Sequence, residues 1–521
     1  MRPSFPGDLP TRGRTRQVRF SESGWATRPL MSSPVSEWQA TPFLEPGSEL
    51  PVYLQIAHAL MRDIHAGRFS PGESLPGYRT VAERLGVSRN TVMAAYAELR
   101  AEGWIVSTPG EGSAVASLLP AHLPPGLEQS ARVRAKPAMG FDLAGETPAA
   151  AVAPQRRLLE VASGVPDPRL LPGAALARNY RRALTQGRAY GAADPQGHPR
   201  LRAALAHLLS RGRGVPTTEA QVLVTRGTQM ALVLVSQALF SPGEAVAVEA
   251  MGGRGAWDAF ARAGARCLPV PVDEEGLQVD ALEPLLRTER LRAVLVTPRR
   301  QYPTLAVLSP GRRARLLSLA QANRFAVLEI DQDSEMQLEG APAAPLAAAA
   351  GAPGVVVHLG TLSKIFSPDL RLGFVHGPAP LVARLREVRA VLDRHGDPVL
   401  ERAMAELMED GELQRHLNRM IQIYRRRRNA LCAALRRTLA EVVSVESPSG
   451  GLALWVPVRP GVDVDRWAAR ALERGVSFQP GRQFAFDGAP VQALRMGFAN
   501  YPEPQLEEVA RRMQAALEDA A

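Results

Sequence analysis

Lysine is nearly absent from this chain of 521 residues: of its 62 basic residues only Lys136 and Lys364 are lysine, and the rest are arginine. Cysteine is also scarce, because Cys267 and Cys432 are the two in the chain, which excludes a disulfide framework and a cysteine zinc site. The histidines show no ligand spacing, so no metal site is expected. No apolar run approaches the roughly 18 residues that a membrane span needs, and no apolar segment follows the N-terminal arginines as in a secretory signal. These absences predict a cytoplasmic protein.

The net charge of +10 suggests an acidic partner such as nucleic acid, but the excess is not gathered where a DNA-binding motif lies. Residues 49–117, which contain that motif, carry six arginines against seven acidic residues, a net charge of −1. The run Arg425–Arg428 falls in a helical pattern and is predicted to be a solvated face rather than a nucleic-acid patch. Bulk charge therefore indicates little about function.

The scarcity of lysine makes each of the two lysines informative. A guanidinium stays protonated and does not form Schiff bases, whereas a primary amine can. Lys136 falls in the linker context Arg-Ala-Lys-Pro and is interpreted as an incidental residue. Lys364 follows an apolar run in Gly360-Thr-Leu-Ser-Lys364, and it is predicted to have a chemical role.

The N-terminal third of the chain changes character twice. Residues 1–48 are rich in Pro, Gly, Ser and Arg without apolar periodicity, which predicts a disordered extension in which Met31 is a candidate start in place of Met1. Residues 49–117 have the apolar periodicity of a compact unit. Residues 118–158 again lack periodicity and are predicted to be a linker to the rest of the chain.

Residues 49–117 predict a winged helix-turn-helix. A first helix with apolar residues at helical spacing ends at Gly67, and a short second helix covers Arg79–Leu85. Ser88 is the predicted N-cap of a third helix that ends near Glu102. Two short apolar segments around a Pro-Gly turn follow, and they predict a hairpin, the wing.

The stretch Leu85-Gly-Val-Ser-Arg-Asn-Thr-Val92 resembles the recognition segment of the GntR-type winged helix. Its polar residues fall in the first turn of the third helix, which meets base edges when such a helix enters a major groove. Arginine can fork onto guanine and asparagine onto adenine, so operator DNA is the expected partner. The resemblance adds the start of the second helix and the wing. The candidate DNA-binding residues are Arg79, Ser88, Arg89, Asn90, Thr91 and Gly110.

Residues 159–521 alternate apolar β runs with amphipathic helices, which predicts an α/β domain with a mostly parallel sheet. This region resembles the aminotransferase-like domain of fold-type I pyridoxal-phosphate proteins, with a large part over about 190–385 and a small C-terminal part over about 386–521. The order of head, linker and this domain resembles the MocR branch of the GntR regulators. The matching motifs include Asp194-Pro-Gln-Gly-His-Pro-Arg-Leu-Arg202, Thr225-Arg-Gly-Thr-Gln229, Thr297-Pro-Arg-Arg-Gln-Tyr-Pro-Thr304, Gly360-Thr-Leu-Ser-Lys364 and Leu494-Arg-Met-Gly497.

By this resemblance Lys364 is the Schiff-base lysine of pyridoxal 5'-phosphate. The phosphate would lie at a helix N-terminus and against a forked arginine, both of which suit an oxyanion. The resemblance also places Tyr302 near the phenolic oxygen of the cofactor, and it assigns Arg495 to the carboxylate of an effector. The candidate cofactor-binding residues are Lys364, Gly227, Thr228, Tyr302, Asp331, Thr361, Ser363 and Arg371.

Several residues depart from the family pattern. The family has Glu-Asp-Asp-Tyr-Asp-Ser-Glu where this chain has Glu329-Ile-Asp-Gln-Asp-Ser-Glu335. Without a gap, the carboxylate that pairs with the pyridine nitrogen becomes Ile330, the tyrosine becomes Gln332, and the stacking tyrosine falls on Gly253. A slip of one residue would bring Asp331 to the ring nitrogen, but it would reverse the side-chain direction in a strand. The family's histidine is Arg300 here, and a further tyrosine falls on Ala192, with Tyr190 nearby.

The departures bear on activity. An apolar group cannot keep the ring nitrogen protonated, and an unprotonated ring is a poor electron sink, so efficient transamination is not expected. The motifs and the resemblance together predict a DNA-binding transcriptional regulator that senses a small amine or amino-acid-like effector through pyridoxal phosphate on Lys364, and the resemblance implies a homodimer. Two alternatives remain: an active pyridoxal-phosphate-dependent aminotransferase with a DNA-binding head, and a cofactor-free regulator with a degenerate pocket.

Overall fold

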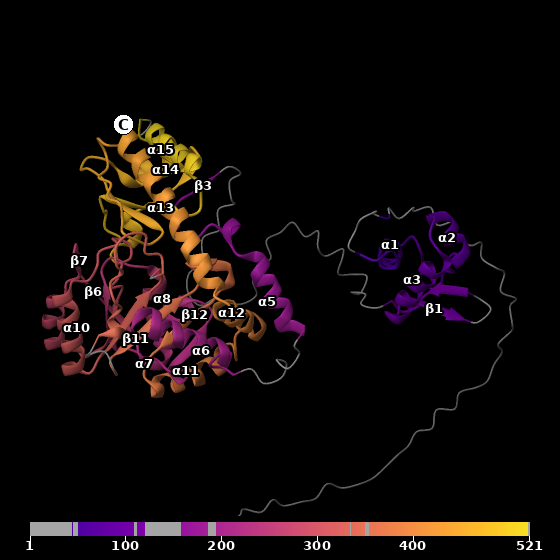
Figure 1. The fold of residues 1–521 in the computed structure, drawn as a ribbon, viewed down its shortest axis with the longest axis horizontal. Helices are drawn as coiled ribbons and strands as arrows, with labels where there is room; N and C mark the ends of the chain where they lie inside the picture. Colours follow the sequence, from indigo (N-terminus) through magenta and orange to yellow (C-terminus); the bar gives the residue numbers. More distant parts are fainter. Residues whose placement is uncertain are drawn as a thin grey trace, which may run out of the picture. The chain divides into compact units, whose positions relative to one another are not determined.

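The computed structural model describes residues 44, 50–108, 112–119, 158–185, 194–333, 335–349 and 354–518. The chain divides into two compact units, Met1–Ala149 and Ala150–Ala521, and Figure 1 draws both of them. Each unit has a hydrophobic core of its own. None of the described helices combines the length and the apolarity that crossing a membrane requires.

The N-terminal unit consists of three helices followed by an antiparallel hairpin (Figure 1). Apolar side chains at helical spacing on all three helices meet in one core, which the start of the hairpin closes. The winged helix-turn-helix predicted from the sequence is confirmed. Its elements are α1 (Val52–His65), α2 (Tyr78–Leu85), α3 (Arg89–Ala101), β1 (Ile105–Thr108) and β2 (Gly112–Val115).

Two local features set the angle between α2 and α3. Gly86 follows α2 with a φ of 64°, a left-handed conformation that glycine adopts without steric cost. Ser88 then caps α3, since its hydroxyl accepts a hydrogen bond from the backbone N–H of Thr91 at 3.1 Å. The buried hydroxyl of Tyr96 donates to the carbonyl of Pro76 at 2.8 Å, which ties α3 to the segment before α2.

A seven-stranded sheet forms the centre of the C-terminal unit, in the order β4-β12-β11-β10-β9-β5-β6. β12 runs antiparallel to β11 and β4, and the other pairs are parallel, so the predicted mostly parallel sheet is confirmed. Every residue of β4, β5, β11 and β12 is buried, as expected where helices cover both faces. The strands are β4 (Val222–Thr225), β5 (Ala245–Glu249), β6 (Arg266–Val270), β9 (Leu291–Val296), β10 (Ala326–Asp331), β11 (Val356–Thr361) and β12 (Gly373–His376).

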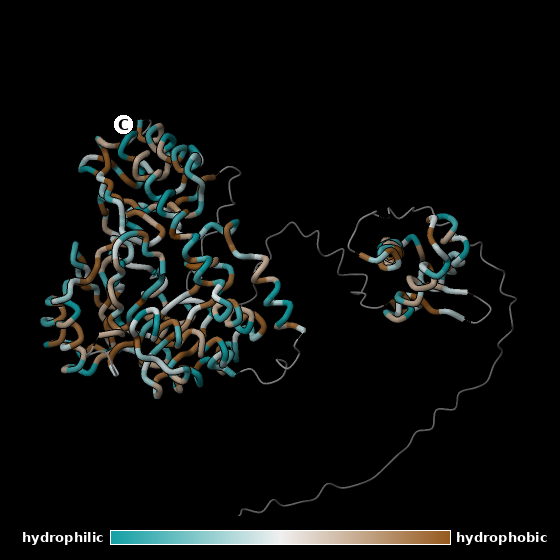
Figure 2. Tube along the Cα trace, in the orientation of Figure 1, coloured by the Kyte–Doolittle hydropathy of each residue, from teal (hydrophilic) through white to brown (hydrophobic). Residues whose placement is uncertain are grey.

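The two faces of this sheet pack against different helices. Leu328 and Ile330 of β10 share a core with α7, α8 and α11, whereas Val327 shares a core with α10. Hydrophobic and hydrophilic segments alternate along these helices in Figure 2, as expected for helices with one face on a sheet. Their bounds, with those of the neighbouring elements, are α5 (Gly173–Thr185), α6 (Pro199–His207), α7 (Thr228–Leu239), α8 (Arg254–Arg262), β7 (Val272–Asp273), β8 (Gly276–Leu277), α9 (Leu282–Thr288), α10 (Pro310–Asn323) and α11 (Ala379–Leu392).

A smaller part built from the C-terminal segment packs beside the sheet (Figure 1). Its three-stranded antiparallel sheet has the order β13-β16-β15. The start of the unit returns to it, because β3 pairs in parallel with β14. The elements are β3 (Leu159–Glu160), α12 (Pro398–Glu409), α13 (Glu412–Thr438), β13 (Ala453–Pro457), α14 (Val464–Glu473), β14 (Val476–Ser477), β15 (Gln479–Pro480), β16 (Ala493–Gly497) and α15 (Glu503–Glu518).

The run Arg425–Arg428 on α13 is only in part the solvated face that the sequence predicts, since Arg426 is exposed and Arg425 is half-buried. Arg427 and Arg428 are buried. Arg427 donates to the carboxylate of Asp167 at 3.0 Å and to a backbone carbonyl, and Arg428 donates to the carbonyl of Pro448 at 2.7 Å. Helical periodicity alone does not show this, because a long arginine side chain can bury its stem and still reach a polar partner.

Candidate cofactor pocket and DNA-reading helix

The predicted DNA-binding residues lie at the start of α2 and in the first turn of α3. Arg79, Arg89 and Asn90 are exposed. Ser88 and Thr91 are engaged with each other, since their hydroxyl oxygens are 2.8 Å apart and the Ser88 hydroxyl caps the helix. These two residues therefore fix the first turn that presents Arg89 and Asn90. Gly110 lies outside the described residues.

A cavity of about 280 Å³ opens at the carboxyl ends of β5, β9 and β10, the edge of a parallel sheet at which ligands bind in open α/β folds. Of the predicted residues, Thr228, Tyr302, Lys364 and Arg495 line it. The three positions that depart from the family pattern, Ile330, Gln332 and Gly253, line it as well.

Lys364 brings a primary amine into this cavity. Its Nζ donates to the backbone carbonyl of Gly164 at 2.6 Å. Burial, with a smaller contribution from the nearby charge of Arg495, lowers the pKa of Lys364 to about 8. The amine is therefore unprotonated far more often near neutral pH than that of an ordinary lysine, and the unprotonated form is the one that attacks a carbonyl carbon.

The predicted phosphate residues gather at the N-terminus of α7. Gly227 precedes the helix with a φ of 81°, and a side chain there would come within 3.6 Å of the Arg371 guanidinium. Arg371 also donates to the carbonyl of Arg226 at 2.9 Å. Thr361 pairs with Gly373 across the neighbouring strands, and its hydroxyl accepts from the backbone N–H of Ser363 at 3.1 Å.

These contacts bring the N-terminus of α7 and the Arg371 guanidinium together. Gly373 lies against Gly227, so the turn after β11, the start of β12 and the start of α7 meet at one point. Backbone N–H groups at a helix N-terminus and a guanidinium both favour an oxyanion. Four of the predicted cofactor-binding residues lie around this point and do not line the cavity itself: Gly227, Thr361, Ser363 and Arg371.

Arg495, on β16, is a buried cation in the wall of the cavity. Its guanidinium carbon lies 4.7 Å from the ring centroid of Tyr302, and the Tyr302 ring packs edge-on against Phe484 at 5.4 Å. Among the described residues the Nε of Arg495 has no hydrogen-bond partner, and Asp333, whose charge favours the protonated guanidinium, is itself ion-paired with Arg300. Burial lowers the pKa of Arg495. An unpaired buried guanidinium is costly in free energy, and an anionic ligand would offset that cost.

Asp331 does not reach the cavity, although the sequence predicts it among the cofactor-binding residues. It follows Ile330 on β10, and successive strand residues point to opposite faces. Its carboxylate accepts from Arg299 at 2.9 Å and from Arg213 at 3.3 Å, and it lies 3.9 Å from the Nε2 of His358. Ile330 is therefore the residue that β10 presents to a ligand.

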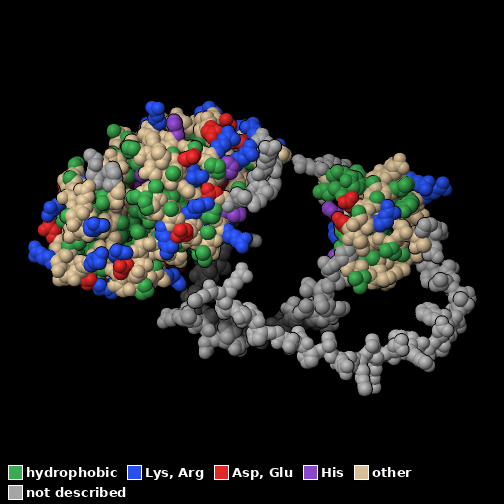
Figure 3. All heavy atoms as spheres, turned by 90° about the horizontal axis from the view of Figure 1, so that it is seen from below, with side chains coloured by type: hydrophobic (Ala, Val, Ile, Leu, Met, Phe, Trp, Pro, Cys, Tyr) green, Lys and Arg blue, Asp and Glu red, His purple; other side chains and the backbone are tan. Residues whose placement is uncertain are grey.

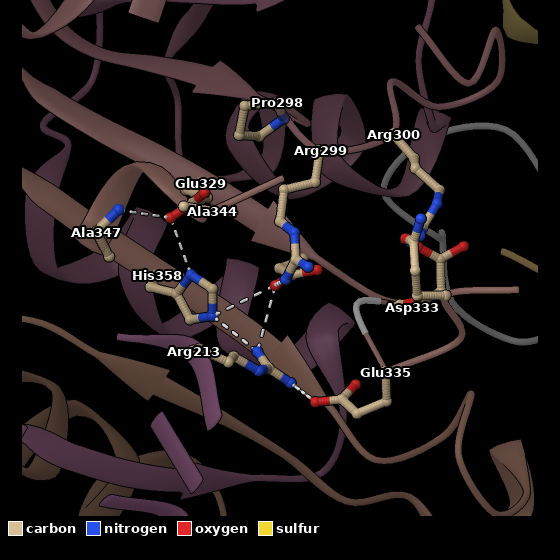
Figure 4. A network of polar contacts seen from close by, with 12 residues as sticks. Arg213, Pro298, Arg299, Arg300, Glu329, Asp333, Glu335, Ala344, Ala347 and His358 are labelled. Atoms are coloured by element: carbon tan, nitrogen blue, oxygen red, sulfur yellow. Dashed lines mark hydrogen bonds and ion pairs between the residues drawn. The ribbon is translucent and has the colours of Figure 1, made fainter. Parts of the chain in front are cut away.

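Asp331 belongs to a cluster of buried polar side chains that continues to Glu329 and Glu335 (Figure 4). His358 lies between Glu329 and Arg213, with its Nδ1 2.9 Å from a carboxylate oxygen of Glu329 and its Nε2 3.1 Å from the Arg213 guanidinium. Arg213 also binds Glu335. Arg213, Asp331 and His358 are nearly or wholly buried. The arginines Arg213 and Arg299 hold the pKa of Asp331 below its usual range, although burial alone would raise it.

Arg300, which stands where the family has histidine, points away from the cavity. It forms an ion pair with Asp333 at 3.0 Å and borders a separate cleft between the large and small parts. Tyr190 and Ala192, the other departure, lie outside the described residues. The described residues contain no group of three or more metal-ligating side chains.

Sequence reasoning missed several residues of the cavity wall, among them Trp257 and Glu249. Trp257 on α8 lies against Gly252 and packs on Phe486 with ring centroids 5.0 Å apart, so it supplies an aromatic wall one turn after Gly253. Glu249 is buried at the end of β5, accepts from the hydroxyl of Thr297 at 2.6 Å, and has its pKa raised to about 7 by burial. The available signals were a tryptophan directly after a Gly-rich turn and a carboxylate that ends an apolar strand.

The comparisons with known proteins agree with this architecture. The family of bacterial regulatory proteins of the gntR type matches residues 52–115, and the aminotransferase class I and II family matches residues 157–513. The probable rhizopine catabolism regulatory protein MocR of Rhizobium meliloti is 31% identical over 91% of this chain and 95% of its own length. The HTH-type transcriptional regulator TauR of Rhodobacter capsulatus is 31% identical over 91% of this chain and 98% of its own length.

Among solved structures, LysN of Thermus thermophilus, an α-aminoadipate aminotransferase in complex with N-(5'-phosphopyridoxyl)-L-leucine, has a TM-score of 0.65 and 31% identity over 70% of this chain and 93% of that chain. The fold and the matches define a class: DNA-binding transcriptional regulators that carry an aminotransferase-like domain. Within that class, the chain belongs to the MocR-type subfamily of the GntR regulators.

The lowered pKa of Lys364 predicts its reactivity. The labelling rate of Lys364 by a small acylating reagent such as acetic anhydride should be half-maximal near pH 8. An ordinary lysine has a pKa of about 10.4. Peptide mapping over pH 6 to 11 measures the rate at this residue, with a free lysine peptide as reference. A Lys364 profile that rises only with the reference peptide would contradict the buried amine.

Arg89 should carry base recognition. Arg89→Ala should weaken operator binding by about 1–3 kcal/mol if the guanidinium forks onto a guanine, and it should reduce discrimination against random DNA. Arg100→Ala, the same change at the other end of α3, should leave that discrimination intact. Titration of both variants at one fixed salt concentration measures the effect, and unchanged specific binding by Arg89→Ala is the contrary result.

Proposed function

We propose that this regulator binds pyridoxal 5'-phosphate on Lys364 and uses it to sense a small amine or amino-acid-like effector. The observation that carries the proposal is the composition of the cavity: one of the chain's two lysines lies there with a lowered pKa, beside a buried arginine whose Nε has no hydrogen-bond partner among the described residues. The cofactor needs an amine that can bond to its aldehyde, and an amino-acid-like effector needs a guanidinium that can bind its carboxylate.

The residues present fit most of this cofactor. The α7 N-terminus and Arg371 would hold its phosphate, and Lys364 would bond to it covalently through its amine. When bound, the cofactor supplies an aldehyde carbon that reacts with primary amines. Tyr302 would face the ring, held in place by Phe484 on one side and by the Arg495 guanidinium on the other.

The effector chemistry follows from the same wall. Arg495 would bind a carboxylate, and an effector amine would compete with the amine of Lys364 for the same carbon. An effector that binds one arrangement of the protein better shifts the population toward it, and by linkage changes operator affinity by the same coupling free energy. We infer a homodimer that acts on operator DNA in the cytoplasm, in keeping with the resemblance to the MocR branch.

An active aminotransferase is the second candidate. Lys364 and Arg495 favour it, and the 2-aminoadipate transaminase of Thermus thermophilus is 33% identical over 69% of this chain. Ile330 argues against it, because an isoleucine cannot hold a proton on a ring nitrogen. Gln332 lacks a phenol and Gly253 lacks a ring to stack, so the electron-withdrawing power of the ring and its packing would both be reduced. A cofactor-free regulator remains the third candidate.

Borohydride reduction tests the cofactor. With saturating pyridoxal phosphate, reduction should leave a pyridoxyl label on Lys364 and on no other residue, as read by peptide mass spectrometry. Lys364→Arg should abolish the label while it keeps the charge, and Lys136→Arg serves as the matched control that should label normally. Labelling at Lys136, or no label on the wild type, would reject the site and favour the cofactor-free regulator.

The apolar side chain of Ile330 in the cavity allows a prediction for variants that restore a carboxylate at this position. Ile330→Asp together with Gln332→Tyr should raise cofactor affinity by about 1.5–3 kcal/mol, because an ionised partner would then bind the ring nitrogen. Ile330→Val, which keeps an apolar side chain at this position, should not raise cofactor affinity. Cofactor titration and single-turnover spectra with amino acids measure affinity and transamination, and tight binding with rapid turnover by the wild type would instead support the aminotransferase.

A further inference from the structure

The second turn of α3 exposes an apolar side chain. Met93 is 45% exposed, and Ala94 and Ala97 beside it are exposed as well. The opposite face of the helix is fully used, since Val92 and Leu99 are buried in the core of the unit. Met93 is not part of the core, so the fold does not require an apolar residue at this position. Its exposed side chain can contact a partner.

Met93 shares a helix face with Arg89. The two are four residues apart, and residues at that spacing lie one above the other on an α-helix. Arg89 and Asn90 occupy the first turn, so the face passes from polar residues in the first turn to Met93, Ala94 and then Ala97. Glu98 and the exposed Arg100 follow in the last part of the helix, so the apolar part of this face is limited to Met93, Ala94 and Ala97.

The charges around this face suit duplex DNA. Arg79 and Arg84 of α2 and Arg89 of α3 are exposed, and neither helix has an acidic residue in its first turn. Basic and apolar side chains both reach the visible surface of the N-terminal unit in Figure 3. Arginines near a helix N-terminus favour phosphates, so the partner that covers Met93 is a DNA duplex rather than an apolar protein surface.

Elimination then identifies the chemical group that Met93 contacts. In the major groove the base edges display hydrogen-bond donors and acceptors, and the apolar group among them is the C5-methyl of thymine. Ala94 has no hydrogen-bonding atom in its side chain, and the thioether sulfur of Met93 is at most a weak acceptor. We propose that Met93 reads the methyl group of a thymine, with the small side chains of Ala94 and Ala97 allowing the helix to approach the base edges closely.

The position of that thymine follows from helix geometry. Four residues rise about 6 Å along an α-helix, and base pairs are stacked about 3.4 Å apart. The thymine should therefore lie one or two base pairs from the base that Arg89 contacts. This inference rests on operator recognition by the head, and not on the cofactor.

Replacement of thymine by deoxyuridine removes this methyl group and changes nothing else on the base edge. The full-length protein first selects duplexes from a random pool at fixed salt, and each thymine of the preferred duplex is then replaced singly by deoxyuridine. One or more of these replacements should weaken wild-type binding about fourfold, the size expected for burial of one methyl group.

Variants at Met93 assign the effect. Met93→Ala should bind the thymine and deoxyuridine duplexes equally, whereas Met93→Leu should keep the difference. Val52→Ala on α1, a residue with a similar exposure of 42%, should also keep it. Far-UV circular dichroism checks that each variant is folded, which is expected because Met93 makes no part of the core.

The outcomes separate the inference from its basis. Equal wild-type affinity for all thymine and deoxyuridine duplexes overturns the inference, and so does a thymine preference that survives in Met93→Ala. Unchanged DNA binding by Met93→Ala would mean that the exposed methionine serves another partner, which also overturns it. Selection that yields no preferred sequence overturns operator recognition itself, and this inference with it.

Discussion

Inside the C-terminal unit, the carboxylate of Asp331 binds the guanidinium groups of Arg213 and Arg299 and lies beside His358. Removing such charges from water costs several kcal/mol for each ion, so no member of the cluster can lose its partners cheaply. Because side chains alternate along a strand, β10 cannot slide by one residue without pulling Asp331 out of the cluster. The register of β10 is therefore fixed, and with it the direction in which Ile330 faces.

The two cations of the cavity depend on each other. Arg495 contributes to the lowered pKa of Lys364, and its own burial is offset only in part by the charge of Asp333, so its pKa is lowered. A carboxylate bound at Arg495 would reduce the field at Lys364 and raise the pKa of its amine. The same contact that recognises an anionic ligand would thus change the protonation of the amine, so charge recognition and amine chemistry are coupled within one cavity.

Local patterns predicted those features that depend on local physics. The Ser88 cap, the turn at Gly86 and the alternation of apolar strands with helices depend on neighbouring residues, and all could be recognised in the sequence. The scarcity of lysine, a property of composition alone, was enough to single out Lys364. By contrast, the residues around Arg427 do not indicate its buried partner Asp167, which is 260 positions away. Trp257 lines the cavity only because α8 packs against β5 and β6.

The departures from the family pattern are not spread at random over the cavity. Groups that would hold a ligand by charge are present, namely Lys364, Arg371 and Arg495, whereas the residues that would tune a ring or stack on it are replaced at Ile330 and Gly253. Loss of function by drift would not spare the costly buried cations, because an unpaired guanidinium destabilises a fold that no longer needs it. Retained binding groups with weakened electronics suit a sensor, since a regulator that consumed its effector would remove its own signal. Under the proposed function, the apolar side chain of Ile330, which β10 presents to the cavity, would separate ligand binding from ligand turnover.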